Sequence, residues 1–253
     1  MYRKILYELR EGVARITLNR PDKRNALDGE IVGELKAAFG ASASDEACRV
    51  VLLMGAGTDF CSGADLANLE KTTQNSVLDN MADARSTADL FLMMRNHPRP
   101  LIAAVHGRAL AGGCGIATAC DIILASQSAQ FGYPEVNIGF VPAMVMAMLR
   151  RSVSEKAAFE LVVTAETVSA ARAHELGLVH RVFGDDRFAA EVEAYTAKLA
   201  TKSPSAVMLS KRLLYNMDTM SFEAALQAGV EVNAIARQTE DCRTGVEKFL
   251  KKG

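Results

Sequence analysis

Residues 101–121 decide the fold class and read Leu-Ile-Ala-Ala-Val-His-Gly-Arg-Ala-Leu-Ala-Gly-Gly-Cys-Gly-Ile-Ala-Thr-Ala-Cys-Asp. The first five residues form a continuous apolar run, which is typical of a strand buried on both faces. Gly112, Gly113 and Gly115 then open a helical stretch. Glycine lets the backbone approach a ligand closely, and the free N–H groups at a helix start favour negative charge. The stretch therefore predicts a strand, a turn and a helix that present N–H groups to an anionic atom.

A second glycine-containing turn follows another apolar run, residues 50–54. It reads Gly-Ala-Gly-Thr-Asp-Phe-Cys-Ser-Gly-Ala-Asp-Leu over residues 55–66. Neither turn carries GxGxxG between a strand and a helix, and the chain has no GxxxxGK[ST] motif. These absences disfavour a nucleotide-phosphate site, including that of a nicotinamide-dependent oxidoreductase. If the two turns converge on one point, their N–H groups would instead make an oxyanion hole.

The other periodic segments place these turns in an α/β domain. Residues 13–19 alternate and are rich in β-branched side chains, which predicts a strand with one face in water, and residues 122–125 form a further buried run. Helical stretches lie between the strands: Asp28 can cap one, and a longer one covers residues 82–94. This succession predicts right-handed βαβ units in a parallel or mixed sheet.

From about residue 152 the strand signals thin out and helix starts repeat. The start signals are a capping-box pattern at Ser152 and Glu155, cap residues at Ser169 and Ser221, a Ser203-Pro204 pair and a lysine-rich amphipathic tail over residues 246–250. We therefore divide the chain into an α/β core, residues 1–195, and a C-terminal helical region, residues 196–253. The helical region is expected to pack on the core or on a neighbouring subunit.

Composition excludes several classes of function. The 253 residues carry 29 Lys and Arg against 30 Asp and Glu, so no excess of positive charge marks a nucleic-acid or anionic-membrane surface. Five cysteines without a CxxC pair or zinc spacing indicate reduced thiols and no metal site. The longest apolar stretch, residues 138–149, contains Pro142 and is shorter than the roughly 20 residues of a membrane span. We expect a cytoplasmic protein.

A third segment, Phe131-Gly-Tyr-Pro-Glu135, sets one carboxylate in apolar company. Burial there would favour the protonated form of Glu135 and raise its pKa toward neutrality, which suits proton transfer. The alternative for Glu135 is an ordinary, partly exposed loop carboxylate. Two other ionisable residues are expected to be structural: His106 in the turn after a strand, and Asp121 as a cap or backbone contact.

Taken together, these segments resemble the crotonase superfamily, the enoyl-CoA hydratase/isomerase family. The matching stretches are Arg20-Pro-Asp-Lys-Arg-Asn-Ala-Leu27, Phe60-Cys-Ser-Gly-Ala-Asp-Leu66, Ala104-Val-His-Gly-Arg-Ala-Leu-Ala-Gly-Gly-Cys114, Phe131-Gly-Tyr-Pro-Glu135 and residues 164–179. They occur in the family's order and span almost the whole chain.

The resemblance implies a crotonase-like spiral of ββα units with a C-terminal helical trimerisation region, as a homotrimer or a dimer of trimers. It implies an acyl-CoA thioester substrate and a thioester enolate held by the backbone N–H groups of Ala64 and Gly112. Coenzyme A would be part of the substrate, so no separate cofactor is expected. By motif position, the residues expected to contact CoA or the acyl group are Arg24, Ala26, Gly63, Asp65, Leu66, Leu110, Gly113 and Pro134. Lys248 or Lys252 could reach CoA phosphates or simply be solvated.

One position departs from the family pattern. Members that act as hydratases carry a glutamate directly after the Gly-Gly-Cys stretch, and this chain has Gly115 there. Glu135 alone remains at a catalytic motif position, and one carboxylate suffices to move a proton between two carbons. We therefore expect isomerisation of a 3-enoyl to a 2-enoyl thioester. The alternatives are 2-enoyl-CoA hydration, acyl-CoA hydrolysis or decarboxylation, and a catalytically weak acyl-CoA-binding protein.

Overall fold

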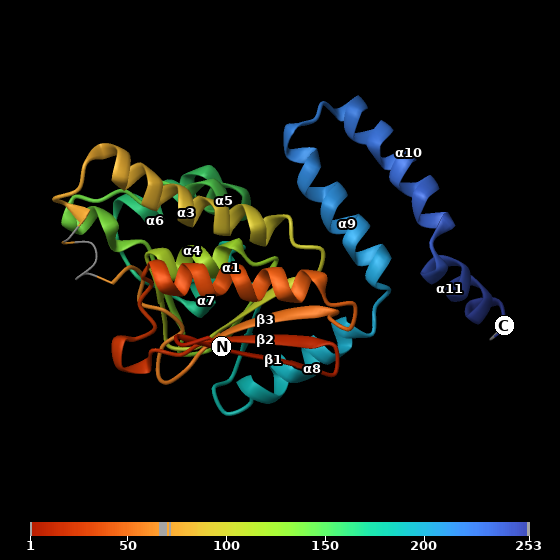
Figure 1. Ribbon diagram of the computed structural model, residues 1–253, viewed down its shortest axis with the longest axis horizontal. Helices are drawn as coiled ribbons and strands as arrows, with labels where there is room; N and C mark the ends of the chain where they lie inside the picture. The colour runs from red at the N-terminus through yellow and green to blue at the C-terminus, as the bar shows by residue number, and fades with distance from the viewer. Residues whose placement is uncertain (1, 66–69, 71, 252–253) are drawn as a thin grey trace.

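The computed structural model describes residues 2–65, 70 and 72–251 (Figure 1). Its larger sheet has six strands in the order β1-β2-β3-β4-β6-β9, and a smaller one has the order β5-β7-β8. The strands are β1 (Ile5–Arg10), β2 (Val13–Leu18), β3 (Val50–Gly55), β4 (Leu101–Val105), β5 (Arg108–Leu110), β6 (Ile122–Ser126), β7 (Gln130–Gly132), β8 (Val168–Ser169) and β9 (Arg181–Phe183). In the larger sheet only β1 and β2 pair antiparallel.

Helices cover both faces of the larger sheet. They are α1 (Gly29–Ser44), α3 (Val77–Arg95), α4 (Gly112–Ala119), α5 (Met146–Ser152), α6 (Glu155–Val163), α7 (Ala170–Glu175), α8 (Phe188–Ala200), α9 (Pro204–Asn216), α10 (Phe222–Gln238) and α11 (Glu240–Leu250), with short 3-10 turns η1 (Pro21–Lys23), η2 (Pro134–Ile138) and η3 (Met217–Thr219). Figure 1 shows α1 and α4 on one side of the strands and α8 on the other.

Burial explains why β3 and β4 are continuous apolar runs. Val51 and Leu53 of β3 pack with the larger cluster beneath α1 and α4, whereas Val50 and Leu52 pack with Val192 of α8 on the opposite face. A strand with a layer on each side has no solvent-facing position, so alternation disappears. The parallel pairing leaves the glycine-rich turns after β3 and β4 at the same edge of the sheet, because parallel strands end together.

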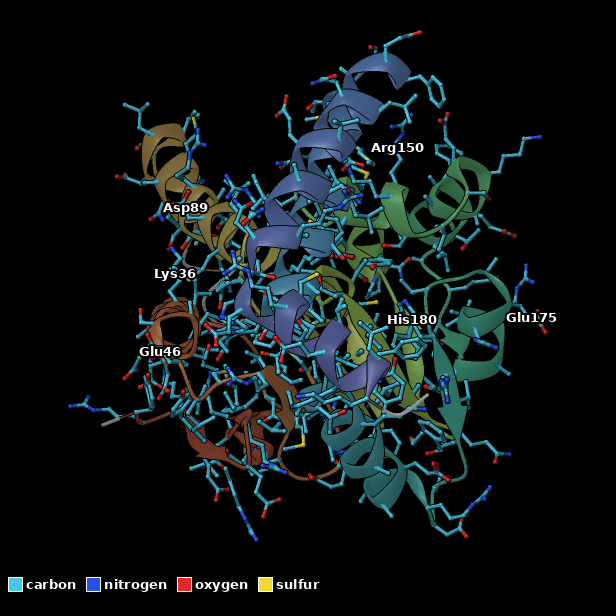
Figure 2. All side chains as sticks on the ribbon, turned by 90° about the vertical axis from the view of Figure 1, so that its right-hand side faces the viewer. Lys36, Glu46, Asp89, Arg150, Glu175 and His180 are labelled. Atoms are coloured by element: carbon cyan, nitrogen blue, oxygen red, sulfur yellow. The ribbon has the colours of Figure 1, made fainter. Side chains whose placement is uncertain are left out.

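The last three helices form an arm that stands away from the core (Figure 1). None of the residues of α9, α10 and α11 is buried in the single chain. Lys211 of α9 anchors the start of this arm: its ammonium group donates to Asp121 Oδ2 at 2.7 Å and to the carbonyl of Arg99 at 3.2 Å. Figure 2 views the molecule from the side of the arm, which lies in front of the core.

The predicted boundary at residue 195 falls inside α8. Tyr195 and Leu199 of this helix pack with the sheet cluster around Val192, so the whole helix covers the core. The projecting arm begins at Pro204, where the Ser203 side chain accepts the N–H of Ala206. We therefore propose that the C-terminal region starts at α9 rather than at residue 196.

The helix caps test the sequence-based expectations in detail. Asp28, Ser169, Ser203 and Ser221 each accept a backbone N–H in the first turn of a helix, as predicted. The capping box at Ser152 is wrong: Ser152 ends α5 and donates to the Met148 carbonyl, and Ser154 caps α6. The pattern misled because two serines precede the helix, and Val153 between them has an extended backbone that separates α5 from α6.

Several strands of the structure differ from the sequence-based prediction. β1, β5, β7, β8 and β9 were not expected, since most of them are two or three residues long and carry no periodic signal of their own. In the part of the chain that the structure describes, no helix has both the length and the apolar character that a membrane crossing requires.

Candidate active site

The two glycine-containing turns meet, as their positions after neighbouring parallel strands predict. Cys61 forms a parallel bridge with Ala109, and the N–H of Leu110 donates to the Cys61 carbonyl at 3.0 Å. Gly63 has φ +100°, and a Cβ there would lie 2.7 Å from the Cβ of Ala111. Only glycine combines that backbone conformation with so close an approach. The turn after β3 is therefore pressed against the turn that leads into α4.

The loop from Arg20 to Asp28 closes the same corner. The N–H of Leu27 donates to the Gly63 carbonyl at 2.7 Å, and the N–H of Asp65 donates to the Leu27 carbonyl at 2.9 Å. This ladder uses the residues on both sides of Ala64, an exposed residue, and does not include the Ala64 N–H. Fully buried Asn25 donates to the carbonyls of Ala56 and Asp59. Backbone and side-chain hydrogen bonds thus fix the loop to the glycine-containing turn that follows β3.

Helix α4 begins at this corner. Its first i→i−4 bond runs from the N–H of Gly115 to the carbonyl of Ala111, so the amides of Gly112 and Gly113 precede the helical ladder. Ala111, the N-cap, has φ 49° and ψ −128°, a backbone conformation that costs a non-glycine residue about 1–3 kcal/mol. Strain of that kind persists only where surrounding contacts impose it. Here those contacts include Gly63, where a Cβ would lie 2.7 Å from Ala111 Cβ, and the Gly132 carbonyl, which accepts the Ala111 N–H.

Glu135 lies in the 3-10 turn η2, which follows β7. Its side chain is buried, and Oε2 has no hydrogen-bond partner. Desolvation raises the pKa of this carboxyl, opposed by a hydrogen bond from its own backbone N–H. Among the described residues, no second charged group contributes to that shift. A buried carboxyl without a partner on one oxygen is suited to exchange a proton with a bound molecule.

The β7 strand connects Glu135 to the corner where the turn of residues 61–64 meets the start of α4, which we call the oxyanion-type corner. The N–H of Ala111 donates to the Gly132 carbonyl at 2.8 Å, and Leu110 packs on Gly132, where a Cβ would lie 3.4 Å from its Cδ2. Glu135 therefore follows within three residues of a strand that is bonded directly to the N-cap of α4. This framework connects the segments that carry the sequence-predicted Gly63, Ala64, Gly112 and Glu135.

The helix position after Cys114 contributes no carboxylate and has no room for one. A Cβ on Gly115 would collide with Cγ1 of Val145 and lie 3.2 Å from Val145 Cβ and 3.6 Å from the ring of Phe91. Val145 is itself buried at the start of α5. Position 115 is therefore filled with apolar packing.

The residues predicted to contact CoA are distributed around this corner. Ala26 is buried, Arg24 is exposed in a left-handed conformation, and Gly113 is packed against Cys61. Asp65 pairs with Arg20, whose guanidinium also bonds Asp28. This ion pair gives Asp65 a structural task that the motif alone did not reveal.

The remaining predicted positions can be placed as follows. Pro134 opens η2, Lys248 lies on α11 in the arm, and Leu66 and Lys252 fall outside the described residues. His106 Nε2 donates to the Gly57 carbonyl at 2.9 Å, a structural bond as expected. Asp121 accepts the Leu101 N–H at 2.7 Å, the backbone contact that was expected.

Other side chains lie at the site although the sequence did not predict them there. Tyr133 and Thr118 are joined by a buried hydrogen bond near Glu135, and Val145 packs on Gly115. These contacts join residues 15 or more positions apart, and nothing local in the sequence marks them. Arg20 and Asn25 lie inside the first resembling motif, which was a usable signal.

Comparison with known proteins shows which family has this sequence and this fold. The family model described as Enoyl-CoA hydratase/isomerase matches residues 8–253. The chain is 38% identical to a Thermus thermophilus protein that carries the provisional name of enoyl-CoA hydratase, over 95% of each chain. It is 31% identical to the 2,3-dehydroadipyl-CoA hydratase of Escherichia coli, with 98% of this chain and 96% of that protein covered. A crystal structure of an enoyl-CoA hydratase of Mycobacterium smegmatis superposes with a TM-score of 0.94 at 35% identity, covering 99% and 97% of the two chains.

The fold defines a protein of the α/β crotonase class, with two sheets and C-terminal helices. The family model also matches almost the full length of the chain. This chain belongs to the enoyl-CoA hydratase/isomerase family.

Proposed function

We propose that this protein hydrates a 2-enoyl-CoA through an enolate-like transition state. The backbone N–H groups of Ala64 and Gly112 hold the thioester oxygen, and Glu135 manages the proton. The observation that carries the proposal is the partnerless, buried Oε2 of Glu135, attached through β7 to the N-cap of α4. The hydratase names of the relatives support hydration over the other reactions of the family.

One carboxylate can balance this reaction. The Glu135 carboxylate accepts a proton from water as the water oxygen bonds to the β-carbon. The electron pair of the double bond moves to the α-carbon and the thioester oxygen, where the N–H groups of Ala64 and Gly112 stabilise the charge. The protonated Glu135 then delivers its proton to the α-carbon. Each well-placed oxyanion donor is worth about 3 kcal/mol in such a step.

Isomerisation is the second candidate function, and Gly115 favours it. Glu135 would take a proton from the α-carbon of a 3-enoyl thioester and return it at the γ-carbon, a transfer that needs no second acid. The preference for this reaction that we expected from Gly115 has no support in the names of the relatives, which are hydratases. Both reactions share the same enolate step.

The residues that the motifs predict to contact the substrate have different surroundings in the structure, and we propose different roles for them. Ala26, Gly63, Leu110, Gly113 and Pro134 lie on segments that join the oxyanion-type turns, and we propose that they line the acyl-CoA path. Arg24 is exposed and is the proposed cation for the phosphates of CoA. Asp65, paired with Arg20, acts in this proposal by holding the turn of Ala64 in place.

We also propose that the arm is the assembly element. Its exposed apolar residues include Leu214, Phe222, Leu226, Val230, Ile235, Val246, Phe249 and Leu250. An unpaired surface of this size is typical of a subunit interface. A homotrimer or a dimer of trimers would cover it, and a cytoplasmic location stays a prediction.

The experiment offers the protein a 2-enoyl-CoA and, separately, a 3-enoyl-CoA in deuterated water. Mass spectrometry follows hydration, double-bond movement and α-deuteration for the wild type and Glu135→Gln. Hydration of the 2-enoyl thioester that Glu135→Gln abolishes, with CoA binding kept, supports the first proposal. Double-bond movement without hydration supports isomerisation. CoA binding with no exchange from either substrate contradicts both and identifies a binding protein.

A further inference from the structure

Three buried polar groups form a network between the Glu135 turn and helix α4. The hydroxyls of Tyr133 and Thr118 lie 2.8 Å apart, and Thr118 donates to the Cys114 carbonyl at 2.8 Å. Because the Thr118 proton is used on that carbonyl, the Tyr133 hydroxyl donates to Thr118. Burial raises the pKa of the neighbouring Cys114 thiol to about 11, so it stays protonated.

The network joins the two halves of the proposed machinery. Tyr133 precedes Glu135 by two residues and is the cap of the turn that carries it. Thr118 and Cys114 lie on α4, whose first residue is Gly112. A second tie between these segments is the bond from the N–H of Ala111, at the start of the helix, to the carbonyl of Gly132, the residue before Tyr133. The hydroxyl pair therefore fixes the Glu135 turn against the body of the helix.

We propose that Tyr133 and Thr118 are positioning residues that set the placement of the Glu135 carboxyl relative to the N–H of Gly112. This inference rests on the proposed function and deepens it. The Tyr133 ring is fully buried, so removal of the hydroxyl alone leaves its packing in place. What is lost is the directional bond, and with it the restraint on the turn.

A small displacement of a catalytic carboxyl group from the reacting atoms lowers the reaction rate more than it lowers the affinity for the substrate. The acyl-CoA is held by its long CoA portion and by the oxyanion N–H groups, which these substitutions do not touch. We therefore expect Tyr133→Phe and Thr118→Val each to lower kcat by roughly 10- to 100-fold while KM changes little. The double variant should be no slower than the slower single variant, because both changes remove the same bond.

The chain offers a matched control in Thr196. It is buried in α8, and its hydroxyl bonds the Val192 carbonyl four residues earlier, just as Thr118 bonds Cys114. Thr196→Val removes the same chemical group from a helix on the opposite face of the sheet. Its effect on stability reports the cost of a lost buried hydroxyl, and its kcat should stay at the wild-type value. Thr118→Ser keeps the hydroxyl and should recover most of the kcat.

The test measures kcat, KM and thermal unfolding for wild type, Tyr133→Phe, Thr118→Val, the double variant, Thr118→Ser and Thr196→Val, with 2-enoyl-CoA as substrate. The expected pattern is a kcat loss confined to the variants that lack the Tyr133–Thr118 bond. An active wild type with Tyr133→Phe and Thr118→Val indistinguishable from Thr196→Val in kcat overturns the positioning role alone. A wild type inactive on both 2- and 3-enoyl-CoA overturns the proposed function, and this inference with it.

Discussion

Val145 occupies the space beside Gly115 that a side chain on α4 would need. Its Cγ1 would collide with a Cβ at position 115, and its Cβ would lie 3.2 Å away from it. The contact seats the start of α5 directly on the backbone of α4, one turn after the amides of Gly112 and Gly113. The absence of a second glutamate at this position is thus built into the packing of the site.

Gly115→Ala should therefore be overpacked. Both Val145 and the helix backbone are buried, so relief requires α4 to move, at a cost of about 1–3 kcal/mol in the free energy of unfolding. The displaced first turn should also lower kcat. Val145→Ala in the same chain should recover much of both losses. Chemical denaturation and steady-state kinetics measure them.

Gly33→Ala is the control for this prediction. Gly33 lies in α1 with nothing within 4 Å of the place its Cβ would take. At this exposed position of the helix the change should stabilise the protein by about 0.5–1 kcal/mol. If Gly115→Ala is as stable and as active as Gly33→Ala, Val145 does not restrain the helix.

The amide of Gly112 can be removed with little change of shape. Gly112→Ala keeps the N–H, and its Cβ would meet only Leu27 Cδ1 at 3.4 Å, an ordinary contact. Gly112→Pro removes the N–H at the first helical position, where proline is tolerated. We expect the alanine variant to retain activity and the proline variant to lose about 10²- to 10³-fold in kcat.

Circular dichroism and CoA binding separate this loss from misfolding. Ala111 has an unusual backbone conformation, and the residue before a proline is itself restricted, so both measurements are needed. A folded, CoA-binding Gly112→Pro protein with wild-type kcat would assign the oxyanion to other donors.

Much of this site could be predicted from short stretches of sequence, and the reason is local. The glycines of both turns, the caps at Asp28 and Ser203, and the apolar setting of Glu135 are each encoded within a few residues. The Val145–Gly115 and Tyr133–Thr118 contacts are not, because they depend on how α5 and η2 pack on α4. The expectation of an isomerase has the same limit, because it rested on position 115 alone. The relatives are named as hydratases and do not support it.

Glu135 should make the stability of the protein depend on pH. Burial raises the pKa of its carboxyl, so over a range of pH the native state holds a proton that the unfolded chain has released. The free energy of unfolding therefore falls as pH rises through that range and levels off above the raised pKa. Glu135→Gln is neutral throughout. It should be more stable than wild type by an amount that grows with pH, even though it is inactive.

Denaturant unfolding from about pH 4 to pH 8 measures the difference between the two proteins. Glu166→Gln, which neutralises an exposed carboxylate, is the control and should follow the wild type. A Glu135→Gln curve parallel to that of the wild type would mean that Glu135 titrates alike in the native and unfolded states.

The ammonium group of Lys211 is largely enclosed and joins the arm to the core, so its loss should be visible in assembly as well as in stability. Lys211 donates to Asp121 Oδ2 at 2.7 Å and to the carbonyls of Met94 and Arg99, and burial lowers its pKa against the opposing effect of Asp121. Lys211→Met leaves Asp121 without its cation, which costs about 3–5 kcal/mol when a buried pair is broken.

Because Lys211 joins α9 to the core, its replacement should also free the arm and weaken any oligomer that the arm builds. Light scattering coupled to size exclusion should show a smaller mass or a dilution-dependent one, with a lower midpoint of thermal unfolding. Lys211→Met combined with Asp121→Asn should regain part of the stability, since no charge is then left unpaired. Exposed Lys198→Met, on α8, should change neither quantity. An unchanged mass and midpoint in Lys211→Met would show that the arm is held by its other contacts.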